Sequence, residues 1–194
     1  MYIVLVTLTI RRLSAMSQNK NFDLDAAIRK VPDFPKPGIL FYDITSIFTN
    51  PPAYKYVIDE MLSRYKDAEI DGVIAIESRG FLLGSCFAVA NGVPLVLARK
   101  KGKLPRKTVE MSYNLEYGSA TLEIHEEDIE LGHRWLIIDD LIATGGTLAA
   151  VAAMIEGKGG VVAGIFSIIG LPFLGFKDKV GKYGPITLID YDSE

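Results

Sequence analysis

Hydrophobic residues along the chain form several short, continuous runs that are bounded by glycine or polar residues. Runs of this length without alternation are typical of strands that are buried on both faces of a sheet. They predict strands at Gly72–Ile76, Val93–Ala98, Trp135–Ile138, Val161–Ile169 and Ile186–Asp190.

Between these runs, apolar residues recur with the spacing of amphipathic helices. Leu148, Val151, Ala152 and Ile155 fall at i, i+3, i+4 and i+7, which predicts a helix directly after the strand at 135–138. A strand, a helix and a strand over residues 72–98 predict a right-handed parallel βαβ unit. Further helices are predicted at Asp23–Arg29, after the N-cap signal Asn50-Pro51, and at Phe81–Ala90, which ends at Asn91-Gly92.

Two more runs, Thr108–Tyr113 and Ser119–Ile124, predict antiparallel strands that are joined through residues 114–118. A long hairpin beside a binding site is able to close over it and exclude water. All these elements together predict a single α/β domain with covering loops.

The composition is compatible with one such domain and excludes some functions. The chain has 194 residues, 49% of them hydrophobic, which is enough for one sizeable core. Its net charge of −3 gives no overall attraction to nucleic acid or to an anionic membrane. The single cysteine, Cys86, cannot form an internal disulfide, which fits a reducing, cytoplasmic compartment.

The first residues are expected to be an extension that activity does not need. The apolar run Tyr2–Ile10 has no basic residue before it, and Arg11 and Arg12 follow it, which is the reverse of a secretory signal. The run is also far shorter than the ~20 residues that span a bilayer. We therefore expect residues 1–15 to be dispensable and residues 16–194 to form the domain.

The most informative stretch is the connection between the strand at 135–138 and the helix after it. Asp139 and Asp140 end the strand, and the loop Ala143–Thr147 is rich in glycine and hydroxyls. Such a loop delivers free backbone N–H groups to a helix N-terminus, which binds an anion such as a phosphate. The two acids suit ribose hydroxyls or the cation that accompanies a diphosphate. The alternative is an ordinary connection with solvated acids, but the hydroxyl-rich loop favours a ribose phosphate.

Two other segments carry candidate chemistry. Residues 31–44 hold three prolines and one glycine, with Phe34, Phe41 and Tyr42 among them, so they predict a shaped loop that covers a site or a rigid tail that packs on the domain. Residues 99–107 hold six cations in nine positions. A solvated loop and a nucleic-acid patch are the alternatives, but the run follows a parallel strand, where α/β sheets bind ligands. We interpret it as a diphosphate site.

Five segments together resemble the adenine phosphoribosyltransferase family: PDFPKPGILFYDITSIF, ESRGFLLG, RKKGKLP, SYNLEYGSATLEI and IIDDLIATGGTL. The resemblance covers roughly residues 28–190. It implies the type I phosphoribosyltransferase fold, with a central, mostly parallel sheet flanked by helices, a small N-terminal hood at approximately 31–44 and a flexible catalytic hairpin loop. It also implies a cytoplasmic homodimer that makes AMP and diphosphate from adenine and phosphoribosyl diphosphate (PRPP) in purine salvage. Mg²⁺ would be held mainly by substrate and water.

The resemblance also implies a role for each site residue. Ala143, Thr144, Gly145, Gly146 and Thr147 would bind the 5′-phosphate, and Asp139 and Asp140 the ribose. Arg79, Arg99, Lys100 and Lys103 would bind the diphosphate, in this subunit or in the neighbouring one. Leu40, Phe41 and Tyr42 would bind adenine, partly through backbone groups, and Glu116 would be the catalytic residue beside the base. The peptide bond Glu77-Ser78 would be cis.

One position departs from the family pattern, because Tyr42 stands where members of the family commonly have arginine. Any contact that the arginine side chain makes is therefore absent or replaced, which leaves the base preference slightly open, although Glu116-Tyr117 still favours adenine. The alternatives are a phosphoribosyltransferase for a 6-oxopurine and a PRPP-binding regulatory protein that acts on nucleic acid. The second needs a basic face or an added module, and the sequence has neither.

Overall fold

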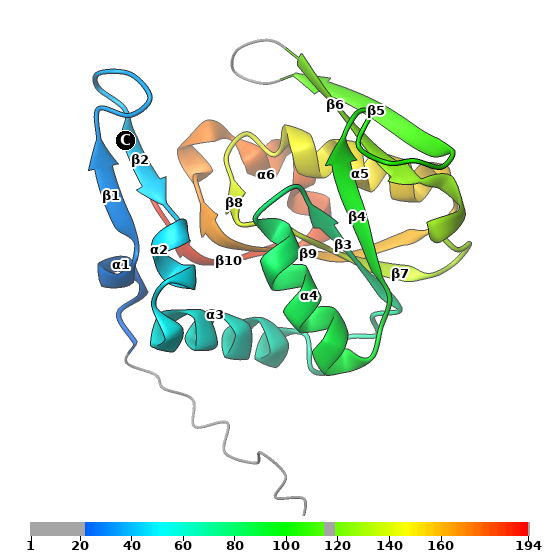
Figure 1. Ribbon diagram of the computed structural model, residues 1–194, viewed down its shortest axis with the longest axis horizontal. Coiled ribbons are helices and arrows are strands. Elements are labelled where there is room, and N and C mark those ends of the chain that lie inside the picture. The colour runs from blue at the N-terminus through cyan, green and yellow to red at the C-terminus, as the bar shows by residue number, and fades with distance from the viewer. Residues whose placement is uncertain (1–21, 115–118, 194) are drawn as a thin grey trace, which may run out of the picture.

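The computed structural model describes residues 22–114 and 119–193. Within them, the molecule is centred on an eight-stranded sheet in which the strands follow the order β10-β9-β7-β3-β4-β6-β5, and β8 pairs with β9 (Figure 1). Neighbours from β10 to β4 are parallel, whereas β6 is antiparallel to β4 and to β5. The predicted mostly parallel sheet is thus confirmed. The strands are β3 (Gly72–Ile76), β4 (Leu95–Lys100), β5 (Thr108–Asn114), β6 (Ser119–His125), β7 (Arg134–Ile138), β8 (Leu141–Ile142), β9 (Val161–Gly170) and β10 (Pro185–Asp190).

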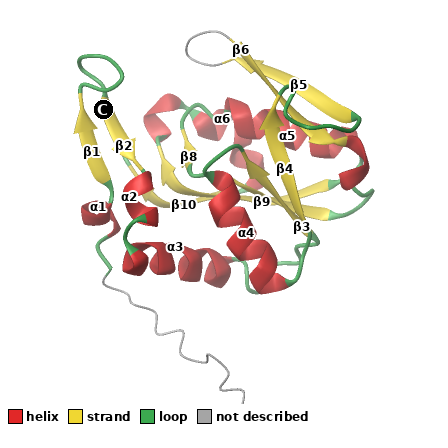
Figure 2. Ribbon diagram, in the orientation of Figure 1, coloured by secondary structure: helices red, strands yellow, loops and turns green. Residues whose placement is uncertain are grey.

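Helices cover both faces of this sheet (Figure 2). Helices α3 (Pro51–Arg64) and α4 (Gly80–Asn91) pack on one face, and α5 (Gly146–Gly157) and α6 (Phe176–Val180) pack on the other. Successive side chains of one strand point to opposite faces of the sheet. In β3, Val73 belongs to the core under α3 and α4, whereas Ile74 belongs to the core under α5. Three short 3-10 helices, η1 (Glu126–Asp128), η2 (Pro172–Leu174) and η3 (Gly181–Tyr183), complete the connections.

One strand boundary differs from the prediction. Strand β4 begins at Leu95 rather than Val93, because the Val93 N–H donates to the carbonyl of Ala88 and so caps α4. It continues to Lys100, which pairs with Leu122 of β6. The first two cations of the basic run therefore lie within a strand and have fixed directions.

The N-terminal hood stands beside the main sheet (Figure 1). It extends on both sides of the predicted range of approximately 31–44 and consists of α1 (Leu24–Ala27), β1 (Arg29–Pro32), β2 (Leu40–Asp43) and α2 (Thr45–Phe48). Instead of the irregular loop that the prolines predicted, β1 and β2 form a two-stranded antiparallel ribbon. The ribbon tolerates proline because Pro32 is at its end and Pro35 lies in the turn, after a cis Phe34-Pro35 bond.

The predicted hairpin is present as β5 and β6, paired from Thr108–His125 to Asn114–Ser119. It extends the edge of the sheet beyond β4, on the side where α5 packs (Figure 1). Its connection at 115–118 and the N-terminal residues 1–21 lie outside the described residues, so the expected dispensable extension at 1–15 stays a prediction. Among the described residues, no helix has the length and apolar character needed to cross a membrane.

Candidate active site

A pocket of about 500 Å³ opens where the predicted phosphate loop faces the hood. The hood contributes residues 39–42, and the loop contributes residues 141–148. Asp139 lines the pocket between these two walls, and Leu171, Phe173 and Leu174 close it from the end of β9. The pocket lies at the carboxyl ends of β7 and β9, which is where open α/β sheets bind ligands. The structure thus brings the predicted adenine-binding and phosphate-binding residues into one cavity.

The phosphate loop is shaped by Gly145. Its φ of +73° is left-handed, and an added Cβ would come within 3.2–3.3 Å of Phe176. Helix α5 starts at Gly146, and its first helical bond runs from the Ala149 N–H to the Gly145 carbonyl at 2.9 Å. The N–H groups of Gly146, Thr147 and Leu148 precede that bond, so no helical carbonyl is available to them. These free donors lie at residues that line the pocket, and the start of a helix is the kind of place where proteins bind anions.

The two adjacent acids have different surroundings. Backbone bonds to β9 fix both, because the Asp139 N–H donates to the Phe166 carbonyl and the Asp140 carbonyl accepts from Ile168 and Ile169. The Asp139 side chain lines the pocket and accepts the Asp140 N–H at 2.9 Å. The Asp140 residue, by contrast, is only 5% exposed and is not among the pocket residues. The sequence predicted one shared role for this pair, whereas in the structure the two carboxylates have different hydrogen-bond partners.

Asp140 is paired with a cation from the neighbouring strand connection. Its Oδ2 lies 2.6 Å from Nε of Arg79, at the start of α4. Burial lowers the pKa of Arg79, but the charge and hydrogen bond of Asp140 and the charges of Asp139 and Asp43 together outweigh it, so the pKa lies above its usual value. Burial and the neighbouring charge of Asp140 both raise the pKa of Asp139 well above the ordinary aspartate value. Arg79 therefore stays charged, whereas Asp139 holds a proton more tightly than a solvated acid.

Gly80 allows this close approach of two strand ends. An added Cβ at Gly80 would lie 2.7 Å from the Ile138 carbonyl oxygen and 3.3 Å from the Asp139 Cα. Because those atoms belong to the backbone, a side chain at Gly80 would push α4 away from β7. The absence of a side chain at Gly80 thus lets the start of α4 lie close enough to β7 for Arg79 to reach Asp140.

Glu77 organises the first two cations of the basic run. Its Oε2 accepts the Arg99 Nε at 3.3 Å and the Lys100 N–H at 3.0 Å. The Arg99 Nη1 also donates to the Lys103 carbonyl at 3.2 Å. The bond Glu77-Ser78 is cis, as the family resemblance implied. Arg99 is therefore held between the end of β3 and the basic loop.

Sequence reasoning missed a second carboxylate that shapes this loop, Glu123 on β6. It is 3% exposed, and its Oε1 accepts the N–H groups of Lys103 and Leu104, both at 2.8 Å. Burial raises the pKa of Glu123, but the hydrogen bonds from the backbone at 102–104 outweigh it and leave the pKa below its usual value. The available signal was a charged residue between two buried apolar ones, Leu122 and Ile124.

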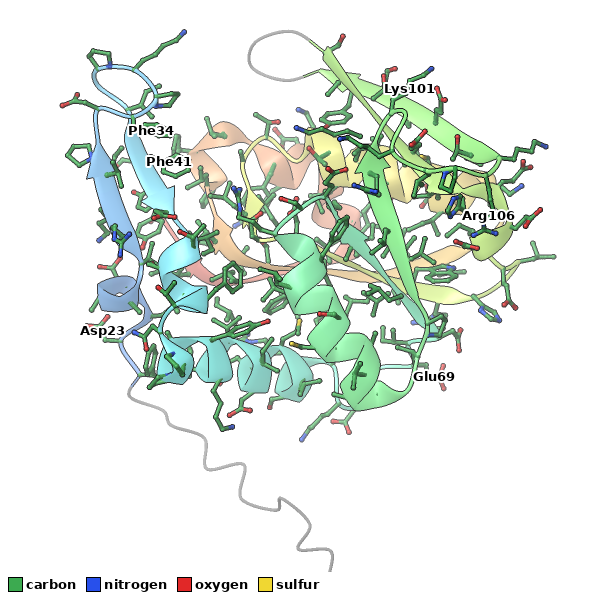
Figure 3. The ribbon with its side chains drawn as sticks, in the orientation of Figure 1. Asp23, Phe34, Phe41, Glu69, Lys101 and Arg106 are labelled. Atoms are coloured by element: carbon green, nitrogen blue, oxygen red, sulfur yellow. The ribbon has the colours of Figure 1, made fainter. Side chains whose placement is uncertain are left out.

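The remaining cations of the run are mostly neutralised. Lys101 pairs with Glu110, Arg106 with Glu127 and Asp128, and Lys107 with Glu126 (Figure 3 labels Lys101 and Arg106). Lys100 and Lys103 form no ion pair with any residue that the structure describes. Two of the four cations predicted to bind diphosphate are thus available to an anion, while Arg79 and Arg99 are held by acids. All four lie outside the residues that line the pocket.

The hood presents its backbone as well as its side chains. Phe34 packs edge-on against Phe41, with ring centroids 5.0 Å apart (Figure 3). Leu40 pairs with Pro32, which has no N–H to donate, so we assign this pair as a non-hydrogen-bonded pair of the antiparallel ladder. Because non-hydrogen-bonded and hydrogen-bonded pairs alternate, the peptide groups of Leu40 and Tyr42 both point away from β1. The free edge of β2 therefore offers N–H and carbonyl groups at two pocket residues.

Four further residues belong to the predicted or the observed site. Glu116, the predicted catalytic residue, lies outside the described residues. Leu171 and Phe173 line the pocket but carried no signal in the sequence, since an apolar LPFL segment is equally typical of a core. Tyr42 lines the pocket, and its ring stacks on Tyr191.

The comparisons with known proteins agree with this geometry. Residues 43–182 match the family model described as a phosphoribosyl transferase domain. The chain is 53% identical over 171 residues to the adenine phosphoribosyltransferase of Treponema denticola, covering 88% of this chain and 90% of that protein.

Solved structures give the same result. The adenine phosphoribosyltransferase of Thermoanaerobacter pseudethanolicus is 42% identical, with a TM-score of 0.83 over 87% of this chain and 98% of that one. The enzyme of Saccharomyces cerevisiae, in complex with D-2,5-dideoxy-2,5-imino-altritol 1,6-bisphosphate and adenine, is 36% identical, with a TM-score of 0.79 over 86% of this chain and 96% of that one. The fold, the pocket and these relatives together show that the chain belongs to the phosphoribosyltransferase family, among the adenine phosphoribosyltransferases.

Proposed function

We propose that this chain transfers the 5-phosphoribosyl group of PRPP to adenine, giving AMP and diphosphate in purine salvage. The observation that carries the proposal is the single pocket in which a helix N-terminus and Asp139 face the free edge of β2. A ribose phosphate fits between the helix N-terminus and Asp139, and a planar base fits against the edge of β2. The relatives named above support adenine as that base.

The sugar phosphate would bind at the loop 143–147. Its phosphoryl oxygens would accept the free N–H groups at the start of α5 and the hydroxyls of Thr144 and Thr147. Asp139 faces the same pocket and would accept a ribose hydroxyl. Asp140 would act mainly through Arg79 in the arrangement described here, and would reach the ribose only if that ion pair opens.

The base would bind at the hood. The amino group of adenine donates hydrogen bonds and its ring nitrogen N1 accepts one, so the base needs an acceptor and a donor side by side. The peptide groups of Leu40 and Tyr42 supply both along the free edge of β2. The Phe41 ring and the apolar side chains of Leu171 and Phe173 would cover the faces of the base.

The departing diphosphate would be stabilised by cations. When the C1–O bond of PRPP breaks, positive charge develops on the ribose ring and negative charge on the diphosphate. Lys100, Lys103, Arg79 and Arg99 would stabilise the second charge, from this subunit or from a neighbouring one. N9 of adenine forms the new bond to C1, and Glu116 would accept or share the proton that N9 loses.

We infer that Mg²⁺ assists, bound mainly by diphosphate oxygens and water. The described residues contain no group of three or more His, Cys, Asp or Glu side chains that could hold a metal. Asp139 brings a carboxylate, an oxygen ligand that Mg²⁺ prefers, to the pocket wall. When bound, the ion would neutralise charge on the diphosphate. We also expect a cytoplasmic homodimer that binds neither nucleic acid nor membrane.

The proposal is tested by incubating the protein with PRPP and Mg²⁺ and, separately, adenine, hypoxanthine, guanine or xanthine. Chromatography should detect AMP and diphosphate with adenine and little product with the other three. If more product forms with hypoxanthine, guanine or xanthine than with adenine, the substrate is a 6-oxopurine. PRPP binding without any nucleotide product would favour a regulatory protein instead.

A further inference from the structure

We infer that Tyr191, near the C-terminal end, is a positioning residue for the base-binding hood. The inference rests on the proposed function, because it concerns how the adenine site is held in place. It assigns a role to a residue outside the pocket, and it explains what Tyr42 does in place of arginine.

The two rings form a close parallel stack. Their centroids are 3.9 Å apart and their planes differ by 15°. Tyr42 is only 9% exposed, so the stack is largely closed to water. Figure 1 shows the C-terminal end beside β2, which agrees with this contact between residues far apart in the sequence. A stacked aromatic pair is held together by more than the burial of its surface.

Tyr191 is itself fixed from several directions. Its N–H donates to the Gly170 carbonyl at 3.0 Å, which ties it to the end of β9. Its hydroxyl donates to Oδ1 of Asp25 at 2.5 Å, and Asp25 is paired with Lys30 at 2.7 Å. The Lys30 ammonium lies 5.4 Å from the centre of the Tyr191 ring. Tyr191 thus joins the main sheet, through its backbone, to α1, β1 and β2, through its side chain.

This connection matters for the base because a two-stranded ribbon has little stability of its own. The peptide groups of Leu40 and Tyr42 read the base only if β2 keeps its distance from the opposite pocket wall. That wall begins at Leu171, the residue after Gly170. Tyr191 contacts both sides, through its N–H to Gly170 and its ring to Tyr42. It therefore sets the spacing between the hood and the wall, without touching the base.

The test compares Tyr191→Ala, Tyr191→Phe and a control, Tyr183→Ala, in the full-length chain. Tyr183 is also a tyrosine near the C-terminus, but it donates to Glu156 on α5. Steady-state kinetics give separate KM values for adenine and PRPP. Tyr191→Ala should raise the KM for adenine by about tenfold and change the KM for PRPP by less than about twofold, because only the hood loses order. Tyr191→Phe keeps the ring and should stay within about threefold of the wild type, and Tyr183→Ala should not change the KM for adenine.

The outcomes separate the inference from the proposed function. If the wild type forms no AMP, the proposed function is wrong. If the wild type is active but Tyr191→Ala leaves the KM for adenine unchanged, raises both KM values equally, or behaves like Tyr191→Phe, the positioning role is wrong. Should Tyr191→Ala fail to fold, Tyr42→Leu removes the same stack from the other side. It must then produce the same selective increase in the KM for adenine, and equal changes in both KM values would overturn the inference.

Discussion

The Nε atom of Arg79 lies 2.6 Å from Oδ2 of Asp140, and this ion pair joins the start of α4 to the end of β7. The Asp140 side chain is 7% exposed, whereas that of Arg79 is 45% exposed. One end of the pair is thus buried in the protein and the other faces solvent. Asp140 therefore fixes the position of Arg79, and the exposed part of the Arg79 guanidinium can contact an anion.

Replacement of Arg79 should therefore affect both catalysis and stability. Arg79→Ala should lower kcat/KM for PRPP by about 100-fold, the scale of losing one charged group that stabilises a transition state. It should also lower the free energy of unfolding by about 1–3 kcal/mol, because Asp140 loses its partner in a buried position. The control is Arg64→Ala, which removes an exposed pair with Glu60 at 3.2 Å and should change little. Equal kinetics for the two variants would exclude Arg79 from the diphosphate site.

The phosphate loop should not tolerate a side chain at Gly145. Gly145→Ala forces a left-handed conformation on alanine, at about 1–2 kcal/mol, and brings its Cβ to 3.2 Å from Phe176. We expect a lower melting temperature and a raised KM for PRPP. Gly157→Ala, at the other end of the same helix, meets no atom within 4 Å and should be neutral or slightly stabilising. If both variants bind PRPP equally well, the loop shape is not what binds the phosphate.

Asp139 should make the protein less stable at neutral pH. Its pKa in the folded protein is raised by burial and by Asp140, so the folded state binds this proton more tightly than the unfolded state does. The resulting stability is present below the ordinary aspartate pKa of about 3.9 and is lost as the pH rises through the raised value. Asp139→Asn should thus raise the melting temperature at pH 7–8, by about 2–4 °C for each 1 kcal/mol that is relieved, while turnover falls.

The pH dependence of this effect is the decisive part. Thermal melts of the wild type and Asp139→Asn should converge as the pH falls below the ordinary aspartate pKa. A stabilisation that is the same at every pH would show that the asparagine improves packing and that the ionisation of Asp139 is not costly.

Glu123 should control PRPP binding without contacting it. Glu123→Gln removes the charge that the Lys103 and Leu104 N–H groups donate to, so the basic loop should loosen. We expect a loss of about 1–3 kcal/mol in the free energy of unfolding and a raised KM for PRPP, with the KM for adenine unchanged. Glu110 is the matched control because it lies opposite Glu123 in the β5–β6 ladder and pairs with the exposed Lys101. Glu110→Gln with the same defect would mean that the hairpin, not the buried carboxylate, is responsible.

Glu116 should be required for chemistry rather than for folding. Glu116→Leu should lower kcat by at least about 100-fold, the range that a positioned proton acceptor contributes. Circular dichroism and the melting temperature should be close to those of the wild type. Near wild-type turnover of Glu116→Leu would remove the residue from the mechanism.

Much of the fold could be predicted from local pattern. The apolar run at 135–138 identified β7 because a short continuous apolar run indicates a buried strand, and the stripe from Leu148 to Ile155 identified α5 because its spacing is helical. The hood was harder. Prolines at 32, 35 and 37 argue against a helix but do not distinguish a loop from a short ribbon, and tertiary contacts of β2 decide between them.

The candidate site was predictable where a single segment carries it, as at residues 139–147. It was not predictable where distant segments meet. No local pattern links Tyr42 to Tyr191, or Glu123 to the backbone at 103–104, because each contact joins residues that only the finished sheet brings together. The different surroundings of Asp139 and Asp140 were hidden for the same reason, since Arg79 comes from another strand connection.

A crystal structure of the protein with AMP would show directly whether the pocket binds the nucleotide as proposed. The phosphoryl group should lie on the N–H groups and hydroxyls of residues 144–147, a ribose hydroxyl at Asp139, and the adenine edge against the backbone of Leu40 and Tyr42. AMP bound elsewhere, or a phosphoryl group away from the start of α5, would contradict this mode of binding.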